Sequence, residues 1–172
     1  MDTWRAAYRG IVPDDYLAGL SYEESERLWL DRLTTDAGGV FVTEDDRGIF
    51  GFASGRPRQK FSKGLEEYGG VFETVYVLPE GQGRGAGLTL MAAVARYLVG
   101  LGITSGLLWV FEENHPARDF YEDFYESLGG TVLAHDGFEL GGAWVREVAY
   151  GWKELGALLS LADPGTPPSP ER

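Results

Sequence analysis

The stretch that decides the fold is VFETVYVLPEGQGRGAGLTLM, residues 71–91. Its first part, Val71–Leu78, is rich in β-branched and aromatic side chains, which is typical of a buried strand. Pro79 ends that strand, and four of the seven residues 81–87 are glycine. Apolar residues then recur at helical spacing, which predicts a helix over Gly85–Leu101. A strand, a glycine-rich turn and a helix, in this order, form the unit with which α/β proteins bind phosphate groups.

The glycine-rich turn fits neither of the two most familiar phosphate motifs. A P-loop requires Lys followed by Ser or Thr after its last glycine, and Gly87 is followed by Leu88. The dinucleotide motif G-x-G-x-x-G fails because its last glycine falls on Ala86 or on Leu88. The pattern that is present is Gln82-x-x-Gly85-x-Gly87. A flexible connector is the alternative explanation for so many glycines, but its place directly between a strong strand and a strong helix favours an anion site.

Further helices and strands are predicted on both sides of this stretch. Helices are predicted over Trp4–Gly10, Tyr22–Thr34 with Ser21 as its N-cap, Pro116–Leu128 and Lys153–Ala162. Strands are predicted over Val40–Thr43, Ile49–Ser54, Ser105–Phe111, Thr131–Leu140 and Ala143–Trp152. Arg56–Gly70 is predicted to be a long loop. The fold class is therefore a mixed α/β (α+β) domain over residues 1–162, with a central mixed sheet flanked by helices and a disordered tail over residues 163–172.

Composition limits the classes of function. The chain has 172 residues, of which 44% are apolar, and this suits one folded domain. It contains no cysteine, so disulfides, zinc–thiolate sites and a cysteine nucleophile are excluded, and we expect no metal. A formal net charge of −12 argues against nucleic acid and anionic membranes as partners and favours cationic small molecules. An acidic surface that only keeps the protein soluble is the alternative. No signal peptide or apolar run of membrane-spanning length is visible, which fits a cytoplasmic protein.

The loop pattern resembles the acetyl-CoA loop of the GNAT superfamily of N-acetyltransferases. The resemblance extends over most of the chain up to about residue 155. The segments that carry it are Val75–Glu80, Leu107–Val110, Glu113–Tyr121, Tyr125–Gly130 and Glu147–Trp152, with a weaker likeness over Trp4–Gly10. It implies a GNAT-like fold, in which two strands splay apart around the coenzyme A site. It also implies acetyl-CoA as the co-substrate and an amine as the acceptor.

The resemblance assigns roles to individual positions. The backbone N–H groups of Gly83, Arg84, Gly85, Ala86, Gly87 and Leu88 should bind the pyrophosphate, in the loop that Gln82 opens. The backbone of Tyr76 and Val77 should hold the pantetheine arm and the acetyl carbonyl. The Arg84 side chain either meets phosphate or is a solvated charge. Asn114 either contacts the cofactor or is a plain helix N-cap.

Acetyl transfer in this chain is predicted to proceed by direct attack of the amine on the thioester. An acyl-cysteine is impossible and no G-x-S-x-G motif is present. His115 and His135 are the two histidines, and His115, next to Pro116, is interpreted as a cap or surface residue. Trp144, Tyr150 and Trp152 of the last strand are interpreted as core rather than as a cage for the substrate.

The general acid that protonates the departing thiolate is predicted to be a tyrosine. The family segment ends in Phe-Tyr, but here the chain repeats it, so that Tyr121 and Tyr125 lie one helical turn apart on nearly the same face. Tyr121 is favoured because the helix start, near Asn114, sets the distance to the loop. The other tyrosine should then be part of the core.

Two departures from the family pattern concern the base and the opening strand. The family often has Glu, which deprotonates the amine, at the position of Val71. Glu73 lies two residues on and faces the same side of the strand, so it is either a substitute base or a solvated or ion-paired carboxylate. The strand with which the family normally opens is either missing or supplied otherwise.

Several alternatives and consequences remain open from the sequence. A domain that binds acyl-CoA as a sensor without turnover, or a plain nucleotide- or phosphate-binding α/β domain, would also fit the loop. If the chain is an enzyme, an acidic group near the predicted cleft favours a cationic amine, an amino sugar or a peptide amine as the acceptor. That acidic group is Glu112, Glu113, Asp119 and Glu122. The long aromatic hairpin at Thr131–Trp152, together with the missing opening strand, predicts a homodimer through the C-terminal strands or their neighbours.

Overall fold

The computed structural model describes residues 2–35, 38–59, 64–128 and 130–162, except for the side chains of residues 2, 123–128 and 161–162. The chain forms two compact units. The first comprises the described residues of 1–38 and 108–151, and the second those of 39–107 and 152–172. The predicted tail over residues 163–172 lies outside the described residues. A single domain over residues 1–162 stays a prediction.

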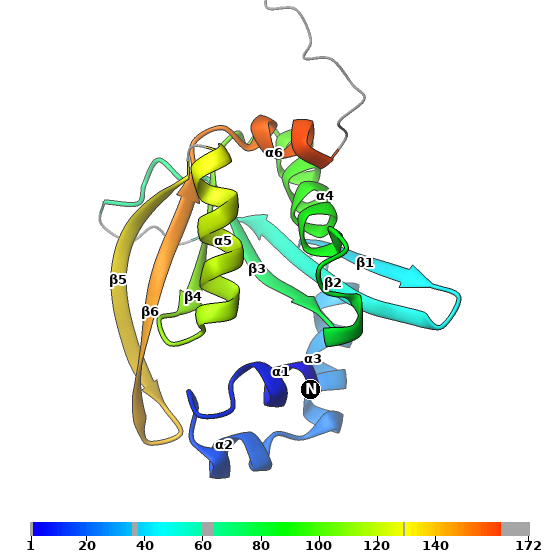
Figure 1. Cartoon of the computed structure of the whole chain (residues 1–172), viewed down its shortest axis with the longest axis vertical. Coiled ribbons are helices and arrows are strands. Elements are labelled where there is room, and N and C mark those ends of the chain that lie inside the picture. The colour runs from blue at the N-terminus through cyan, green and yellow to red at the C-terminus, as the bar shows by residue number, and fades with distance from the viewer. Residues whose placement is uncertain (1, 36–37, 60–63, 129, 163–172) are drawn as a thin grey trace, which may run out of the picture. The chain divides into compact units, whose positions relative to one another are not determined.

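The strands form a six-stranded sheet in the order β1-β2-β3-β4-β6-β5 (Figure 1). Their bounds are β1 Gly39–Asp45, β2 Gly48–Pro57, β3 Gly70–Val77, β4 Gly106–Phe111, β5 Thr131–Leu140 and β6 Ala143–Trp152. β1 with β2, β2 with β3, and β5 with β6 are antiparallel, whereas β3 and β4 are parallel. The sheet is therefore mixed, as the sequence predicts. The splaying of two strands that the resemblance implies stays a prediction.

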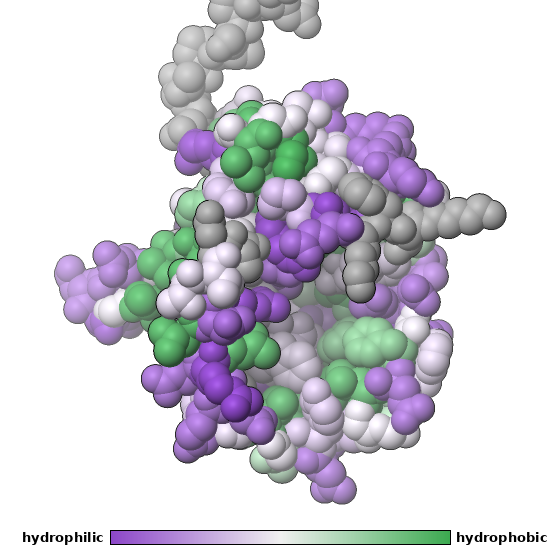
Figure 2. All heavy atoms as spheres, turned by 180° about the vertical axis from the view of Figure 1, so that it is seen from behind, coloured by the Kyte–Doolittle hydropathy of each residue, from purple (hydrophilic) through white to green (hydrophobic). Residues whose placement is uncertain are grey.

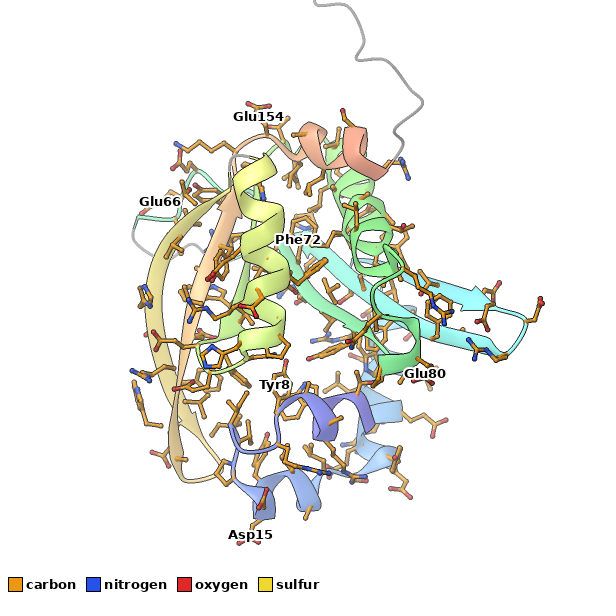
Figure 3. The ribbon with its side chains drawn as sticks, in the orientation of Figure 1. Tyr8, Asp15, Glu66, Phe72, Glu80 and Glu154 are labelled. Carbon is orange, nitrogen blue, oxygen red and sulfur yellow. The ribbon has the colours of Figure 1, made fainter. Side chains whose placement is uncertain are left out.

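The second unit packs helix α4 (Ala86–Gly100) on one face of β1, β2 and β3 (Figure 1). The side of α4 that carries Leu90, Met91, Val94, Ala95 and Leu98 is almost completely buried. Glycine at position 55 permits this close approach, because a Cβ there would lie 2.3 Å from a methyl carbon of Val94. This unit also contains the 3₁₀ turn η1 (Pro79–Gly81) and α6 (Leu155–Ala162). Phe72 of β3, labelled in Figure 3, packs edge-on against Trp152.

The first unit contains α1 (Asp2–Ala7), α2 (Asp14–Gly19), α3 (Tyr22–Thr34) and α5 (His115–Leu128), together with β5. The Ser21 hydroxyl accepts a hydrogen bond from the backbone N–H of Glu24, which confirms Ser21 as the N-cap of α3. Aromatic rings link α1 to β4, since Tyr8 packs against Trp4 on one side and Phe111 on the other. Some large apolar side chains of both units are exposed, and Figure 2 shows apolar (green) areas among hydrophilic (purple) ones. Trp144 is one of the exposed side chains, so its interpretation as core is wrong, whereas Tyr150 and Trp152 are buried as expected.

Most predicted elements are present, although several differ in extent. The helix predicted over Trp4–Gly10 is found over Asp2–Ala7, and the helix predicted over Lys153–Ala162 begins at Leu155. α3, β5 and β6 have the predicted bounds. The short helix α2 was missed because it has six residues and a single buried apolar side chain, Leu17, so it shows no helical periodicity. β2 continues to Pro57, into the predicted loop. Among the described residues before β1 there is no strand, and Arg9 and Val12 form an isolated bridge. Of the two alternatives left open for the opening strand, this agrees with its being missing.

Candidate active site

The glycine-rich loop of the second unit connects the end of β3 to the start of α4. After β3, the N–H of Leu78 donates to the carbonyl of Phe50 (2.8 Å), and η1 turns the chain toward the helix. Gly83 and Gly85 have φ angles of 70° and 79°, in the left-handed region that favours glycine. Gly85 is the N-cap of α4. The predicted strand–turn–helix unit is therefore present, with glycine at the two positions where the backbone requires it.

The Gln82 side chain has a structural role in this loop. Its Nε2 donates to the carbonyl oxygen of Val77, the last residue of β3 (3.0 Å). This bond ties the middle of the loop to the end of the strand. A long side chain that carries an N–H donor suits this position, which gives a physical reason for the first residue of the loop pattern.

The outer side of the loop is open. A Cβ added at Gly83 or Gly85 would meet no atom within 4 Å, and residues 82–85 are exposed. At Gly81, by contrast, a Cβ would lie 2.4 Å from the Phe50 ring, so this glycine serves packing. The N–H groups of the first turn of a helix have no carbonyl partner inside the helix, and here that turn begins directly after the open glycines. The loop therefore presents N–H groups and the positive end of the α4 dipole to an anion.

The strand register decides which backbone groups of β3 are directed at β2. Because Leu78 bonds to Phe50, antiparallel alternation makes Tyr76 and Phe52 the next hydrogen-bonded pair. The N–H of Val77 points to the opposite edge of β3, and its carbonyl accepts the Gln82 bond there. The register therefore favours Val77 as the cofactor-facing residue. The backbone groups of Tyr76 are directed at β2, and a contact of Tyr76 with the cofactor stays a prediction.

Glu73 lies at a β-bulge in β3. Ser54 of β2 is opposite Thr74, whereas Gly55 is opposite Phe72, so Glu73 has no residue opposite it. Its carboxylate oxygen Oε1 accepts a hydrogen bond from Nε of Arg56 at 2.7 Å. Of the two roles left open for this residue, the ion pair is therefore observed, and its role as a base stays a prediction.

Arg56 was missed by the sequence analysis because it falls in the predicted loop. A pattern in β2 identifies it in retrospect, since Phe52, Ser54 and Arg56 alternate with Ala53 and Gly55. Alternate residues of a strand share a face, so these three side chains lie opposite the α4-facing side. The Ser54 and Thr74 hydroxyls are hydrogen-bonded at 2.7 Å, and the Phe52 and Tyr76 rings pack with centroids 5.4 Å apart.

In the first unit, Asn114 is the N-cap of α5. Its Oδ1 accepts a hydrogen bond from the N–H of Ala117 at 3.4 Å, and the residue is 9% exposed. The cap that the sequence offered as one interpretation is therefore observed, and a contact with the cofactor stays a prediction. His115 is exposed, as expected of a surface residue.

Tyr121 of α5 is buried, with 7% of its surface exposed. Its ring lies 5.2 Å from that of Phe120 and 6.1 Å from that of Tyr150. Burial, with a smaller effect of Tyr8, raises the pKa of the Tyr121 phenol above its usual value, so the phenol is protonated at neutral pH. The Tyr125 side chain lies outside the described residues. The choice of Tyr121 over Tyr125 as the acid therefore stays a prediction.

Arginines pair with three of the four carboxylates that were expected to attract a cation. Glu122 accepts hydrogen bonds from Arg118 (3.0 Å) and from the Tyr150 hydroxyl (2.5 Å), and these bonds lower its pKa. Arg146 pairs with Glu113 (2.9 Å) and with Glu112 (3.1 Å). The sequence could not reveal the pairs with Arg146, because that arginine lies on β6, more than 30 residues along the chain from both carboxylates. The local negative charge is therefore smaller than the sequence suggests.

In the described ranges, no helix is long and apolar enough to cross a membrane.

Comparison with known proteins identifies the family. The profile of the Acetyltransferase (GNAT) family matches residues 4–124. The chain is 39% identical over 162 residues to the uncharacterized N-acetyltransferase YuaI of Bacillus subtilis (strain 168), covering 94% of this chain and 87% of that protein.

Two solved structures have the same fold. The PaiA N-acetyltransferase of Thermoplasma acidophilum in complex with coenzyme A has a TM-score of 0.60 at 16% identity, over 85% of this chain and 84% of that one. A chimera of the spermidine N-acetyltransferase SpeG of Vibrio cholerae and hSSAT has a TM-score of 0.56 at 22% identity, over 81% and 80% of the two chains. With the family profile and the relative from Bacillus subtilis, these findings show that the chain belongs to the Acetyltransferase (GNAT) family and is an acyltransferase.

Proposed function

We propose that this protein transfers an acetyl group from acetyl-CoA directly to a primary amine, without a covalent enzyme intermediate. The observation that carries the proposal is the open pair of positive-φ glycines, Gly83 and Gly85, directly before the first turn of α4. That arrangement suits a pyrophosphate, and the neighbour from Thermoplasma acidophilum was solved with coenzyme A. In the second unit, the proposed cofactor site consists of the loop Gln82–Gly87, the N–H groups up to Leu88 and the edge of β3 at Val77. The contact of Asn114 with the cofactor, which the resemblance implies, is proposed separately.

The proposed reaction forms one bond and breaks one. The lone pair of the neutral amine forms a C–N bond to the thioester carbonyl carbon, and the carbonyl oxygen becomes an oxyanion. The C–S bond then breaks with its electron pair on sulfur, and sulfur takes up a proton to give the free thiol of coenzyme A. The nitrogen loses a proton, so an ammonium acceptor releases one proton in net terms and becomes an N-acetyl amide.

The chain offers a group for each charge that develops. The N–H of Val77, directed away from β2, is the proposed donor to the oxyanion. Tyr121, or Tyr125 in its place, is the proposed acid for the thiolate. Glu73 is the proposed base. It is bonded to Arg56 through Oε1, so a proton taken directly from the amine would go to Oε2 or would displace that bond.

The proposed acceptors are small cationic amines, amino sugars and peptide amines. The net charge of −12 supports a cation at long range, although three of the four nearby carboxylates are paired with arginine. One fold neighbour is a chimera that includes a spermidine N-acetyltransferase. The absence of cysteine fits the predicted cytoplasmic location.

An acetylation screen against a library of amines, read by mass spectrometry and by release of the thiol of coenzyme A, tests this function. Thiol release that depends on an amine supports the enzyme. Binding of acetyl-CoA without release for any amine would favour the sensor module. Retention on immobilised coenzyme A that ATP or NAD competes as well as coenzyme A does would favour a general nucleotide-binding domain.

We also propose a homodimer through the C-terminal hairpin. β5 is the last strand in the sheet order, so one of its edges is open to a second strand. Phe138 of β5 and Trp144 of β6 are exposed, and 69% of the Trp144 surface is accessible. A symmetric pairing of two hairpins would cover both side chains.

Replacing Trp144 by Ser is expected to weaken the dimer at least ~10-fold, because a buried interfacial tryptophan typically contributes 2 kcal/mol or more. Sedimentation equilibrium or light scattering at tens of micromolar measures the change. Ile49→Ser is the matched control, since Ile49 is an exposed apolar residue of the other hairpin, β1–β2. A wild-type protein that is monomeric under these conditions would remove the dimer proposal.

A further inference from the structure

Three cross-strand pairs form a row on one face of β2 and β3 in the second unit. They are the rings of Phe52 and Tyr76, the hydroxyls of Ser54 and Thr74, and the ion pair of Arg56 and Glu73. Successive pairs are two residues apart along β2, which is about 7 Å. We name this row the acceptor row, and it lies on the side of the strands that α4 does not cover.

The two faces of these strands have opposite chemistry. The residues of β1, β2 and β3 on the α4 side are mostly apolar, with Ala53 fully buried beside Phe41 and Val75 in register. Thr43 of β1 is the polar exception on this side. The acceptor row instead has two hydroxyls and two charges on side chains that are mostly buried. Ser54 is 3% exposed, and the Arg56 and Glu73 side chains are 30% and 20% exposed. Largely buried charges are costly, and a pair adds little stability over apolar residues of the same size. Such polar groups on an otherwise apolar sheet are typical of a ligand site.

Glu73 accepts a hydrogen bond from only one of the N–H groups of Arg56. A guanidinium has five N–H donors, and Arg56 gives the one on Nε to Glu73. Among the described residues, neither of its Nη atoms has a hydrogen-bond partner. Glu73 therefore fixes the guanidinium from one side and leaves the Nη edge for another group. That edge has the spacing that binds a carboxylate through two parallel hydrogen bonds.

The Arg56 pair and the Phe52–Tyr76 pair are two steps of about 7 Å apart, so an acceptor that reaches from Arg56 to Val77 must carry its carboxylate several residues away from its amine. We propose that Arg56 is a specificity-determining residue that binds a carboxylate of the acceptor, and that the preferred acceptors are therefore short peptides with a free C-terminal carboxylate rather than simple amines. Glu73 acts as a positioning residue for Arg56. The Ser54 and Thr74 hydroxyls lie next along the row toward Val77, where the amine meets the thioester, and the Phe52 and Tyr76 rings receive an apolar side chain. The inference rests on the proposed acetyl transfer and narrows its acceptor. Net charge acts on the acceptor at long range, whereas Arg56 acts on contact.

The test compares the tripeptides leucyl-glycyl-glycine and phenylalanyl-glycyl-glycine, each with its C-terminal amide, as acceptors. Each pair differs in the carboxylate alone, so the ratio of the two kcat/KM values isolates its contribution. In wild type, the ratio favours the free acid. Arg56→Gln is expected to lower that ratio by roughly 10- to 100-fold, chiefly through a higher KM for the free acid, because one charged hydrogen-bonding partner is lost. Arg56→Lys should restore part of it, since it keeps the charge without the planar fork.

Two further variants separate recognition from folding. Arg56→Gln takes the Arg56 partner from Glu73, so the double variant Arg56→Gln/Glu73→Gln removes both charges while keeping shape. It also removes the proposed base, so kcat should fall for both acceptors of each pair, while their ratio should fall to the same level as in Arg56→Gln. Arg47→Gln is the matched control, because it breaks an exposed pair with Asp45 (2.8 Å) on the β1–β2 turn and should leave the ratio unchanged. A ratio that is the same in wild type and in Arg56→Gln overturns the inference. If wild type acetylates no amine and releases no thiol, the proposed function itself fails instead.

Discussion

Replacing Gly85 by valine is expected to weaken coenzyme A binding about 100-fold, because a side chain would occupy the open outer side of the loop. A valine Cβ at this position meets no protein atom within 4 Å, so the space it enters is the space that the proposal gives to the pyrophosphate. Two charged hydrogen bonds to backbone N–H groups, each contributing about 1.5 kcal/mol, account for a loss of this size. Isothermal titration with coenzyme A measures the affinity directly.

Gly102, at the other end of α4, supplies a matched control for backbone strain. Its φ angle is 80°, against 79° for Gly85, and a Cβ there also meets nothing within 4 Å. It ends α4 in a Schellman motif, in which the N–H of Ile103 donates to Leu98 and that of Gly102 donates to Val99. Valine at either position is strained by about 1–3 kcal/mol, so both variants should melt at a lower temperature. Coenzyme A affinity should fall in Gly85→Val alone.

Gly87→Val provides an independent check inside the first turn of α4. This residue has helical backbone geometry, so valine adds bulk beside the proposed pyrophosphate without forcing a left-handed φ angle. If Gly87→Val binds coenzyme A as wild type does, or if Gly102→Val weakens binding as much as Gly85→Val, the assignment of the loop is wrong.

Local patterns explain which parts of the fold could be predicted. The strand Val71–Leu78, the proline and the glycines after it, and the apolar side of α4 are each encoded within about 20 neighbouring residues. Ser21 likewise identifies the start of α3 through a hydrogen bond to a residue three positions away. Such features depend on backbone geometry at short range, and the sequence displays them directly.

Pairings between distant residues could not be predicted in the same way. The bulge that places Glu73 beside Arg56 depends on the register of β2 with β3 across a 17-residue separation. The partner of Glu113 lies 33 residues away on β6. From one sequence, a carboxylate near a predicted cleft has the same appearance whether it is paired or not. The sequence therefore suggested a larger net negative charge around Glu112, Glu113, Asp119 and Glu122 than the structure shows, and it did not reveal the role of Arg56.

Tyr121→Phe is expected to lower kcat by about 100-fold, if the Tyr121 phenol donates the proton that the thiolate of coenzyme A takes up. Burial favours the neutral form of this phenol and so raises its pKa above the usual value of 10. The phenol is therefore protonated at neutral pH and at moderately alkaline pH. Its deprotonation should therefore cause no fall in kcat between pH 7 and pH 9. Among the described residues, the Tyr121 hydroxyl has no hydrogen-bond partner, so its removal should change the free energy of unfolding little.

Tyr150→Phe is the control for a tyrosine hydroxyl that serves structure. That hydroxyl donates to Glu122 and accepts from Nε of Arg118 (3.1 Å), so its removal takes a hydrogen-bond partner from each of two charged groups. We expect a loss of about 1–3 kcal/mol in the free energy of unfolding and a smaller effect on kcat than that of Tyr121→Phe. Chemical denaturation and steady-state kinetics on the same preparations separate the two effects.

Tyr125→Phe completes the comparison, since Tyr125 lies one helical turn beyond Tyr121 on α5. The start of α5 is fixed by the Asn114 cap, so the two phenols differ by ~6 Å along the helix axis and a single one of them can reach the sulfur. The sequence predicts that the tyrosine that is not the acid belongs to the core, and Tyr121 is buried. Comparing the two variants therefore tests directly whether Tyr121 is the acid. A 100-fold loss in Tyr125→Phe with near wild-type kcat in Tyr121→Phe would transfer the role to Tyr125. Small and equal losses in both would mean that water or the substrate protonates the thiolate.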